Sequence, residues 1–125
     1  MIERPTFKKG RIMSFKYAFD GIAAAIKQEP SLKIHLLFAF LVPVAAIYLK
    51  VSRMESIILV LLIGLVLALG LTNTAIEAVV NHFTDLYHPG AKLAKDISAG
   101  AVLVLTITAI IIGVSIFLPY ISELL

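Results

Sequence analysis

The chain has 125 residues, of which 60% are hydrophobic, and its mean hydropathy is +1.00. These values exceed those of ordinary soluble domains, so the sequence predicts a single domain that resides in a lipid bilayer. Eleven basic residues outnumber eight acidic ones, and the absence of cysteine excludes disulfides, zinc–thiolate sites and cysteine nucleophiles.

The first predicted element is an amphipathic helix over residues 10–28, in which apolar side chains recur at intervals of three and four residues. We expect this helix to lie in the plane of the membrane interface, because lysines and Arg11 flank its apolar side. It should end at Glu29, since Pro30 disfavours helical geometry in the residue before it. The apolar positions are Ile12, Phe15, Phe19, Ile22, Ala23 and Ile26.

Three transmembrane helices are predicted to follow, over residues 33–50, 56–82 and 97–119, against a requirement of roughly 17–25 residues per span. Six of the eleven basic residues precede the first span and a seventh, Lys33, begins it, while Lys92 and Lys95 lie between the second and the third. The positive-inside rule therefore places the N-terminus and the loop 81–96 in the cytoplasm. No nucleic-acid motif accompanies these charges, so the expected partner is anionic lipid. The predicted class is an all-α integral membrane protein.

Polar residues gather at the cytoplasmic side of the predicted spans. Asn73 precedes Glu77 by four residues, so the amide and the carboxylate share one face of a helix. Glu29, Asp96 and the two lysines of the 81–96 loop are expected at the same interface. Carboxylates suit Mg²⁺ with phosphate ligands, and lysines suit phosphate itself. The pattern favours phosphoryl transfer at a membrane surface, and a small transporter or channel subunit is the alternative.

Three spans offer little interior in which these polar groups can be buried. Homo-oligomerisation would supply that interior, and small residues allow helices to approach closely. The small residues in question are Gly64, Ala68, Gly70, Ala99, Gly100 and Ala101.

Several motifs carry a resemblance to a known family. They are residues 15–18 with Gly21, residues 29–36, residues 73–80 (NTAIEAVV), residues 94–96 and residues 99–103. With these motifs the sequence resembles the prokaryotic diacylglycerol kinase family. Residues 116–119 are similar to the C-terminal end of its Gram-positive branch, whose members phosphorylate undecaprenol. The resemblance implies three membrane helices with an amphipathic N-terminal helix, a homotrimer with shared active sites, and a location in the bacterial cytoplasmic membrane.

The resemblance also implies roles for individual residues, with ATP as co-substrate and Mg²⁺ as cofactor. Glu29 and Glu77 would hold Mg²⁺ on the nucleotide, and Asn73 would steady the acceptor hydroxyl or a catalytic carboxylate. The nucleotide itself would contact Arg11, Tyr17, Tyr87, His88, Lys95 and Asp96.

One position departs from the family pattern. The general base of the family is a glutamate three residues before the motif asparagine, and Gly70 stands there in this chain. A positioned base is worth about 10²–10⁴-fold in rate, so reduced activity is expected unless Asp96 or water substitutes. A member that binds Mg-nucleotide or lipid without turnover is the alternative. Asn81 likewise occupies a position that is commonly Asp in the family.

Overall fold

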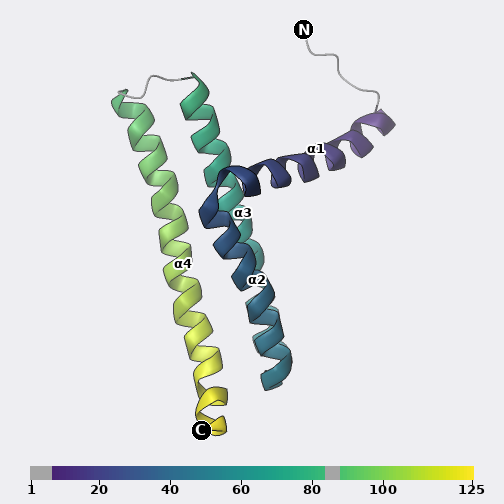
Figure 1. Ribbon diagram of the computed structural model, residues 1–125, viewed down its shortest axis with the longest axis vertical. Helices are drawn as coiled ribbons and strands as arrows, with labels where there is room; N and C mark the ends of the chain where they lie inside the picture. The colour runs from purple at the N-terminus through teal and green to yellow at the C-terminus, as the bar shows by residue number, and fades with distance from the viewer. Residues whose placement is uncertain (1–6, 84–87) are drawn as a thin grey trace.

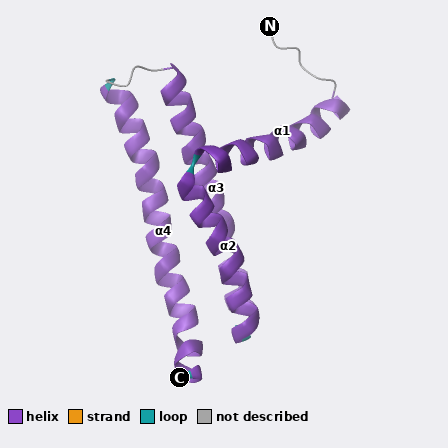
Figure 2. Cartoon of the chain, in the orientation of Figure 1, coloured by secondary structure: helices purple, strands orange, loops and turns teal. Residues whose placement is uncertain are grey.

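The computed structural model describes residues 7–83 and 88–125, and these residues form four α-helices. The helices are α1 Phe7–Gln28, α2 Pro30–Leu49, α3 Arg53–Phe83 and α4 Pro89–Leu124. Within the two described ranges there is no β-strand, and loops are confined to short connections (Figure 2). The all-α prediction is confirmed.

Proline and capping side chains set the helix ends. Glu29 has extended backbone angles (φ −115°, ψ 106°) and Pro30 begins α2, so α1 ends there. α2 ends at Lys50, whose left-handed φ of 54° turns the chain while its amide donates to carbonyls of the last helical turn. Ser52 and Glu55 then exchange two hydrogen bonds between amide and side chain, at 3.0 and 3.2 Å. This capping box starts α3.

The three long helices form an elongated bundle in which α3 packs against both α2 and α4 (Figure 1). α1 projects sideways from the bundle, and its junction with α2 lies toward the end where α3 finishes and α4 begins, which we call the α1 end (Figure 1). Mean hydropathies of 2.1, 2.6 and 2.8 make α2, α3 and α4 apolar enough to cross a membrane. Three helices long and apolar enough to span a membrane are therefore present as predicted, whereas the interfacial position of α1 stays a prediction.

α4 differs most from its predicted bounds. The sequence predicts a loop over 81–96 and a span over 97–119, but α4 already begins at Pro89 and continues to Leu124. Proline fits the first turn of a helix, and no helix-breaking residue follows it before residue 99 except Gly90. The 36 residues of α4 extend about 54 Å, which exceeds a hydrocarbon core of about 30 Å. Lys92, Lys95 and Asp96 therefore lie on a helix that outreaches the bilayer.

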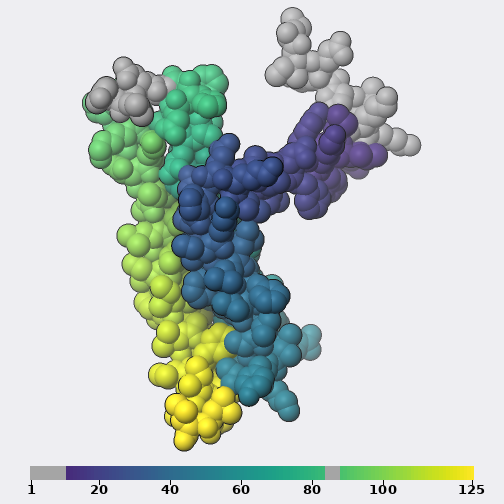
Figure 3. All heavy atoms as spheres, in the orientation of Figure 1, coloured from purple at the N-terminus to yellow at the C-terminus, as the bar shows by residue number. Residues whose placement is uncertain are grey.

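The bundle buries few side chains of its own. Among the described residues no large side chain is fully buried, and Figure 3 shows a narrow body from which α1 projects. Exposed apolar side chains on α2, α3 and α4 suit contact with lipid or with further copies of the chain. The buried positions near the α1 end are small or polar apart from Leu32: they are Ala25, Gly70, Thr74, Ala91 and Ser98.

Candidate active site

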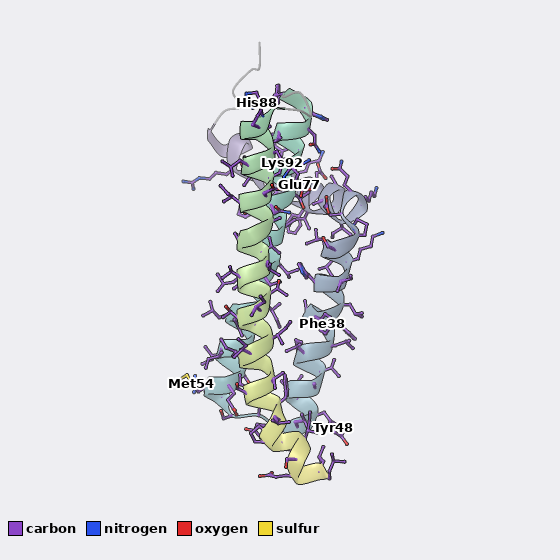
Figure 4. The ribbon with its side chains drawn as sticks, turned by 90° about the vertical axis from the view of Figure 1, so that its left-hand side faces the viewer. Phe38, Tyr48, Met54, Glu77, His88 and Lys92 are labelled. Carbon is purple, nitrogen blue, oxygen red and sulfur yellow. The ribbon has the colours of Figure 1, made fainter. Side chains whose placement is uncertain are left out.

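A short hydrogen-bonded chain joins α3 to α4 at the α1 end. Asn73 Nδ2 donates to Glu77 Oε1 across one helical turn at 3.4 Å. The Asn73 amide oxygen accepts a hydrogen bond from Ser98 Oγ on α4 at 2.6 Å. Figure 4 shows Glu77 on this part of α3. Because both atoms of the amide group are engaged, its orientation is fixed with the NH₂ group toward the carboxylate.

Glu29 approaches Glu77 from the junction of α1 and α2. A hydrogen bond to the Glu77 side chain, partial burial and repulsion by the Glu77 charge together raise the pKa of Glu29 above its ordinary value. Two carboxylates from different parts of the chain therefore lie close together, and the negative charge of one disfavours ionisation of the other. Such a pair can be neutralised either by a shared proton or by a bound cation.

The donor chemistry of the carboxylate pair suits the predicted Mg²⁺. The described residues contain no group of three or more His, Cys, Asp and Glu side chains that could hold a metal ion together. Mg²⁺ does not need one, since it is usually held by one or two carboxylates together with water and substrate phosphate oxygens. Glu29 and Glu77 thus fit Mg²⁺ bound to a phosphate ligand, and they fit a closed structural metal site poorly.

The charged residues of α4 lie on two different faces. Lys95 is half-buried, and its Nζ donates to Asn81 Oδ1 on α3 at 3.0 Å. Lys92 Nζ and Asp96 Oδ2 form an ion pair of 2.6 Å, with side chains 76% and 59% exposed. Asp96 precedes Ser98 by two residues, so it points about 160° away from the Ser98–Asn73 contact. The structure brings Lys95 toward the site, and it turns Asp96 away within the same chain.

Gly70 lies one turn before Asn73 and is buried against α2. A Cβ atom placed on Gly70 would lie 3.4 Å from Leu32 Cδ1 and 3.5 Å from His35 Nδ1, which are ordinary contact distances. The Gly70 carbonyl accepts a hydrogen bond from Thr74 Oγ1 at 3.0 Å. The place of the family's general base is therefore bordered by an imidazole ring.

Two of the other predicted nucleotide contacts lie on α1, and a third lies at the start of α4. His88 caps α4, and its Nδ1 accepts hydrogen bonds from the amides two and three residues later at 3.1 and 3.3 Å. Only its Nε2 remains for another partner. Arg11 and Tyr17 have exposed side chains on α1, whose N-terminal end projects away from the bundle (Figure 1). Tyr87 lies outside the described residues.

The sequence motifs assign no functional role to two residues of this region, Ser98 and His35. Ser98 follows Lys95 by three residues, and this helical spacing could have suggested that both face α3. His35 stands in an apolar run, where the sequence favours an interface-facing or hydrogen-bonded histidine. Its Nδ1 is instead buried and has no hydrogen-bond partner in the described part of the chain.

Comparisons with known proteins identify the family of this chain. The family model for prokaryotic diacylglycerol kinase matches residues 16–117. An undecaprenol kinase of Bacillus subtilis (strain 168) is 42% identical over 106 residues, which cover 85% of this chain and 86% of that protein. A diacylglycerol kinase of Synechocystis is 37% identical over 115 residues, covering 91% and 66%. The diacylglycerol kinase of Escherichia coli K12 is 33% identical over 95 residues, covering 76% and 78%.

The matched region includes both carboxylates of the pair, the oriented asparagine and the lysine that faces α3. The chain therefore belongs to the prokaryotic diacylglycerol kinase family, a family of lipid kinases.

Proposed function

We propose that this protein transfers the γ-phosphoryl group of Mg-ATP to the hydroxyl group of a membrane lipid alcohol. The observation that carries the proposal is the convergence of Glu29 and Glu77 beside an oriented Asn73, at one end of three apolar helices. Undecaprenol is the favoured acceptor, because the 42% identical relative is named undecaprenol kinase. Diacylglycerol is the second choice, after the names of the other relatives.

Glu29 and Glu77 are the residues that would hold Mg²⁺ against the nucleotide phosphates. When bound, the ion would neutralise the negative charge of the phosphates and stabilise the negative charge that develops on their oxygens during transfer. The chain contributes the orientation of the two carboxylates. Glu77 is held by Asn73, and the pKa of Glu29 is raised by Glu77, so bound Mg²⁺ would relieve a repulsion that the fold itself creates.

Lys95 would supply a cation for phosphate oxygens. Its Nζ is held by the neutral amide of Asn81, so its charge is not cancelled by that partner. Lys92, by contrast, is already paired with Asp96. We therefore assign Lys95 to the β- and γ-phosphates, and assign further nucleotide contacts to Asp96, to His88 through Nε2, and to Tyr87.

A homotrimer with shared sites would explain the placement of α1. Arg11 and Tyr17 lie on a helix that projects from its own bundle, so they would reach the nucleotide of a neighbouring copy more readily than their own. The many exposed apolar side chains of the three long helices support such an assembly. We place the α1 end in the cytoplasm, at the bacterial cytoplasmic membrane, because most of the basic residues lie at that end.

A second candidate function follows from Gly70. A family member without a base could bind Mg-ATP or lipid without turnover, and no carboxylate occupies that place in this chain. The two candidates differ in one measurement. Purified protein in bicelles is incubated with Mg-ATP labelled at the γ-phosphate and with undecaprenol or diacylglycerol, while calorimetry measures Mg-ATP binding.

Label that appears in the lipid supports the kinase. Mg²⁺-dependent binding of ATP without labelled lipid supports the binding protein. If neither binding nor transfer is detected, both candidate functions are wrong.

A further inference from the structure

His35 borders the position that lacks the family's catalytic side chain. Its Nδ1 lies 3.5 Å from a Cβ placed on Gly70. The carboxyl carbon of a glutamate stands only two bonds beyond its Cβ, so a carboxylate at position 70 could lie close to the imidazole ring. A group able to accept a proton is therefore present beside Gly70, although it is supplied by α2 instead of α3.

The hydrogen-bonding state of His35 indicates that a partner is missing. Its Nδ1 is buried and unpaired in the described part of the protein. Buried polar atoms almost always have a partner, so an orphan calls for an explanation such as a ligand. The nearest polar side chains on α3 cannot provide one in this arrangement, because Thr74 donates to the Gly70 carbonyl and Asn73 is engaged by Ser98 and Glu77.

The ring also borders a cavity of about 440 Å³ between α2, α3 and α4. Apart from His35 the cavity is lined by uncharged residues, almost all of them apolar, including Phe38, Leu59, Val66, Ala109 and Phe117. His35 is therefore the one ionisable group at an apolar space. A lipid alcohol would complement this cavity, because it has a hydroxyl group at the end of an apolar chain.

Other titratable groups are placed less well to act on a hydroxyl beside Gly70. Glu77 is seven residues from Gly70, a rise of roughly 10 Å along α3, and it is committed to Glu29 and Asn73. Asp96 is exposed and paired with Lys92. On α2 and α1 the charged residues nearest in sequence, Lys33 and Lys27, have exposed side chains.

We propose, on the basis of the proposed kinase function, that His35 takes over the role of the missing carboxylate and accepts the proton of the lipid hydroxyl. The acceptor O–H bond breaks, and its proton moves to Nδ1 of the neutral ring. The lipid oxygen forms a bond to the γ-phosphorus while the bond from that phosphorus to the β–γ bridging oxygen breaks. ADP leaves with that electron pair, and the imidazolium returns its proton to water.

The test measures phosphate transfer to undecaprenol in bicelles by the full-length protein under saturating Mg-ATP. His35→Asn keeps a hydrogen-bonding atom near the position of Nδ1 but cannot take up the proton. It should lower kcat by about 10²–10⁴-fold and leave the KM for ATP unchanged. The fall of kcat on acidification, caused by protonation of the ring, should disappear in this variant. His82→Asn, a change at an exposed histidine of α3, is the matched control and should alter neither quantity.

Gly70→Glu completes the experiment. In the His35→Asn background the new carboxylate should restore most of the lost kcat, whereas in the wild-type background it should add little. His35→Gln is the second variant, to be used if His35→Asn loses Mg-ATP binding, and the same results are expected of it.

The proposal is overturned if both His35 variants keep the wild-type kcat and pH profile. It is also overturned if Gly70→Glu raises kcat equally with and without His35, or if only proteins that carry Gly70→Glu transfer phosphate. In the first two cases the proposed kinase function survives, whereas in the third the wild-type protein has no turnover and the proposed kinase function fails for this chain. Absence of transfer by the wild type and by Gly70→Glu alike would instead remove the kinase function, and this inference with it.

Discussion

Ser98 on α4 fixes Asn73 on α3: its Oγ donates to the asparagine amide oxygen at 2.6 Å, which leaves the amide NH₂ to face Glu77. A hydroxyl on one helix thereby orients a side chain on another, and through it a proposed metal ligand. The contact is also one of the few polar links between α3 and α4. Ser98 itself is buried, so its hydroxyl has little access to water in place of Asn73.

We expect Ser98→Ala to lower kcat and to weaken Mg²⁺-dependent ATP binding, because Asn73 would lose the partner that sets its orientation. Leaving one side of a buried hydrogen bond unsatisfied costs about 1–3 kcal/mol, so a lower Tm should accompany the change. Kinetics and thermal unfolding of the purified protein measure both effects. Ser115→Ala is the control, since Ser115 Oγ bonds only to a carbonyl of its own helix. Equal effects of the two variants would contradict the assigned role of Ser98.

Asn81→Asp is expected to raise the KM for ATP. Lys95 is held by the neutral Asn81 amide at 3.0 Å, and an aspartate there would cancel the lysine charge that we assign to phosphate. Lys95→Gln should act in the same direction with a larger effect. Lys50→Asn, at the opposite end of the bundle, should leave the KM unchanged, and asparagine tolerates the left-handed backbone at that position. If Asn81→Asp lowers the KM, Lys95 does not contact the phosphates.

Glu77→Gln is expected to abolish activity and to change how stability depends on pH. The pKa of Glu29 is raised in the folded protein, so the folded state holds this proton more tightly than the unfolded state does. The resulting stability of the metal-free protein is fully present below the ordinary glutamate pKa of about 4.3 and is lost as pH rises through the raised value. Glutamine removes the opposing charge and should reduce this loss. Thermal unfolding without Mg²⁺, from acid to neutral pH, checks the prediction, which fails if both proteins lose the same stability.

Tyr120→Phe tests a contact that lies far from the site. The Tyr120 hydroxyl on α4 donates to Glu55 Oε1, and Glu55 also caps the first turn of α3. Loss of this hydroxyl should lower Tm without changing the KM for ATP, because the contact joins α3 and α4 at the end opposite Glu77. A changed KM with unchanged Tm would show that this end of the bundle communicates with the site.

Most of the fold was predictable because its signals are local. Long apolar runs predict three membrane helices, Pro30 predicts the break after α1, and the spacing of Asn73 and Glu77 predicts their shared face. The start of α4 was not predictable in this way. Polarity suggested a loop over 81–96, but polar residues are as compatible with a helix that outreaches the bilayer, and proline at its first turn favours that helix.

The sequence could predict only those features of the site that depend on spacing within one helix. Glu29 and Glu77 were expected at one interface, but their mutual effect depends on how α2 packs against α3. The different partners of Lys95 and Asp96 depend on α4 being helical there, because successive helical residues point about 100° apart. The role proposed for His35 had no sequence signal, because its unpaired Nδ1 and its closeness to Gly70 exist only after α2 and α3 are packed.

The central claim is that this chain is an ATP- and Mg²⁺-dependent lipid kinase despite Gly70. It is tested most directly by incubating the bicelle-reconstituted wild-type protein with γ-labelled ATP and undecaprenol, with and without Mg²⁺, and with Glu77→Gln as the paired negative control. The account predicts labelled undecaprenyl phosphate that appears only with Mg²⁺ and only with Glu77 intact. Saturable Mg-ATP binding with no labelled undecaprenol or diacylglycerol, even at high protein concentration, would contradict it.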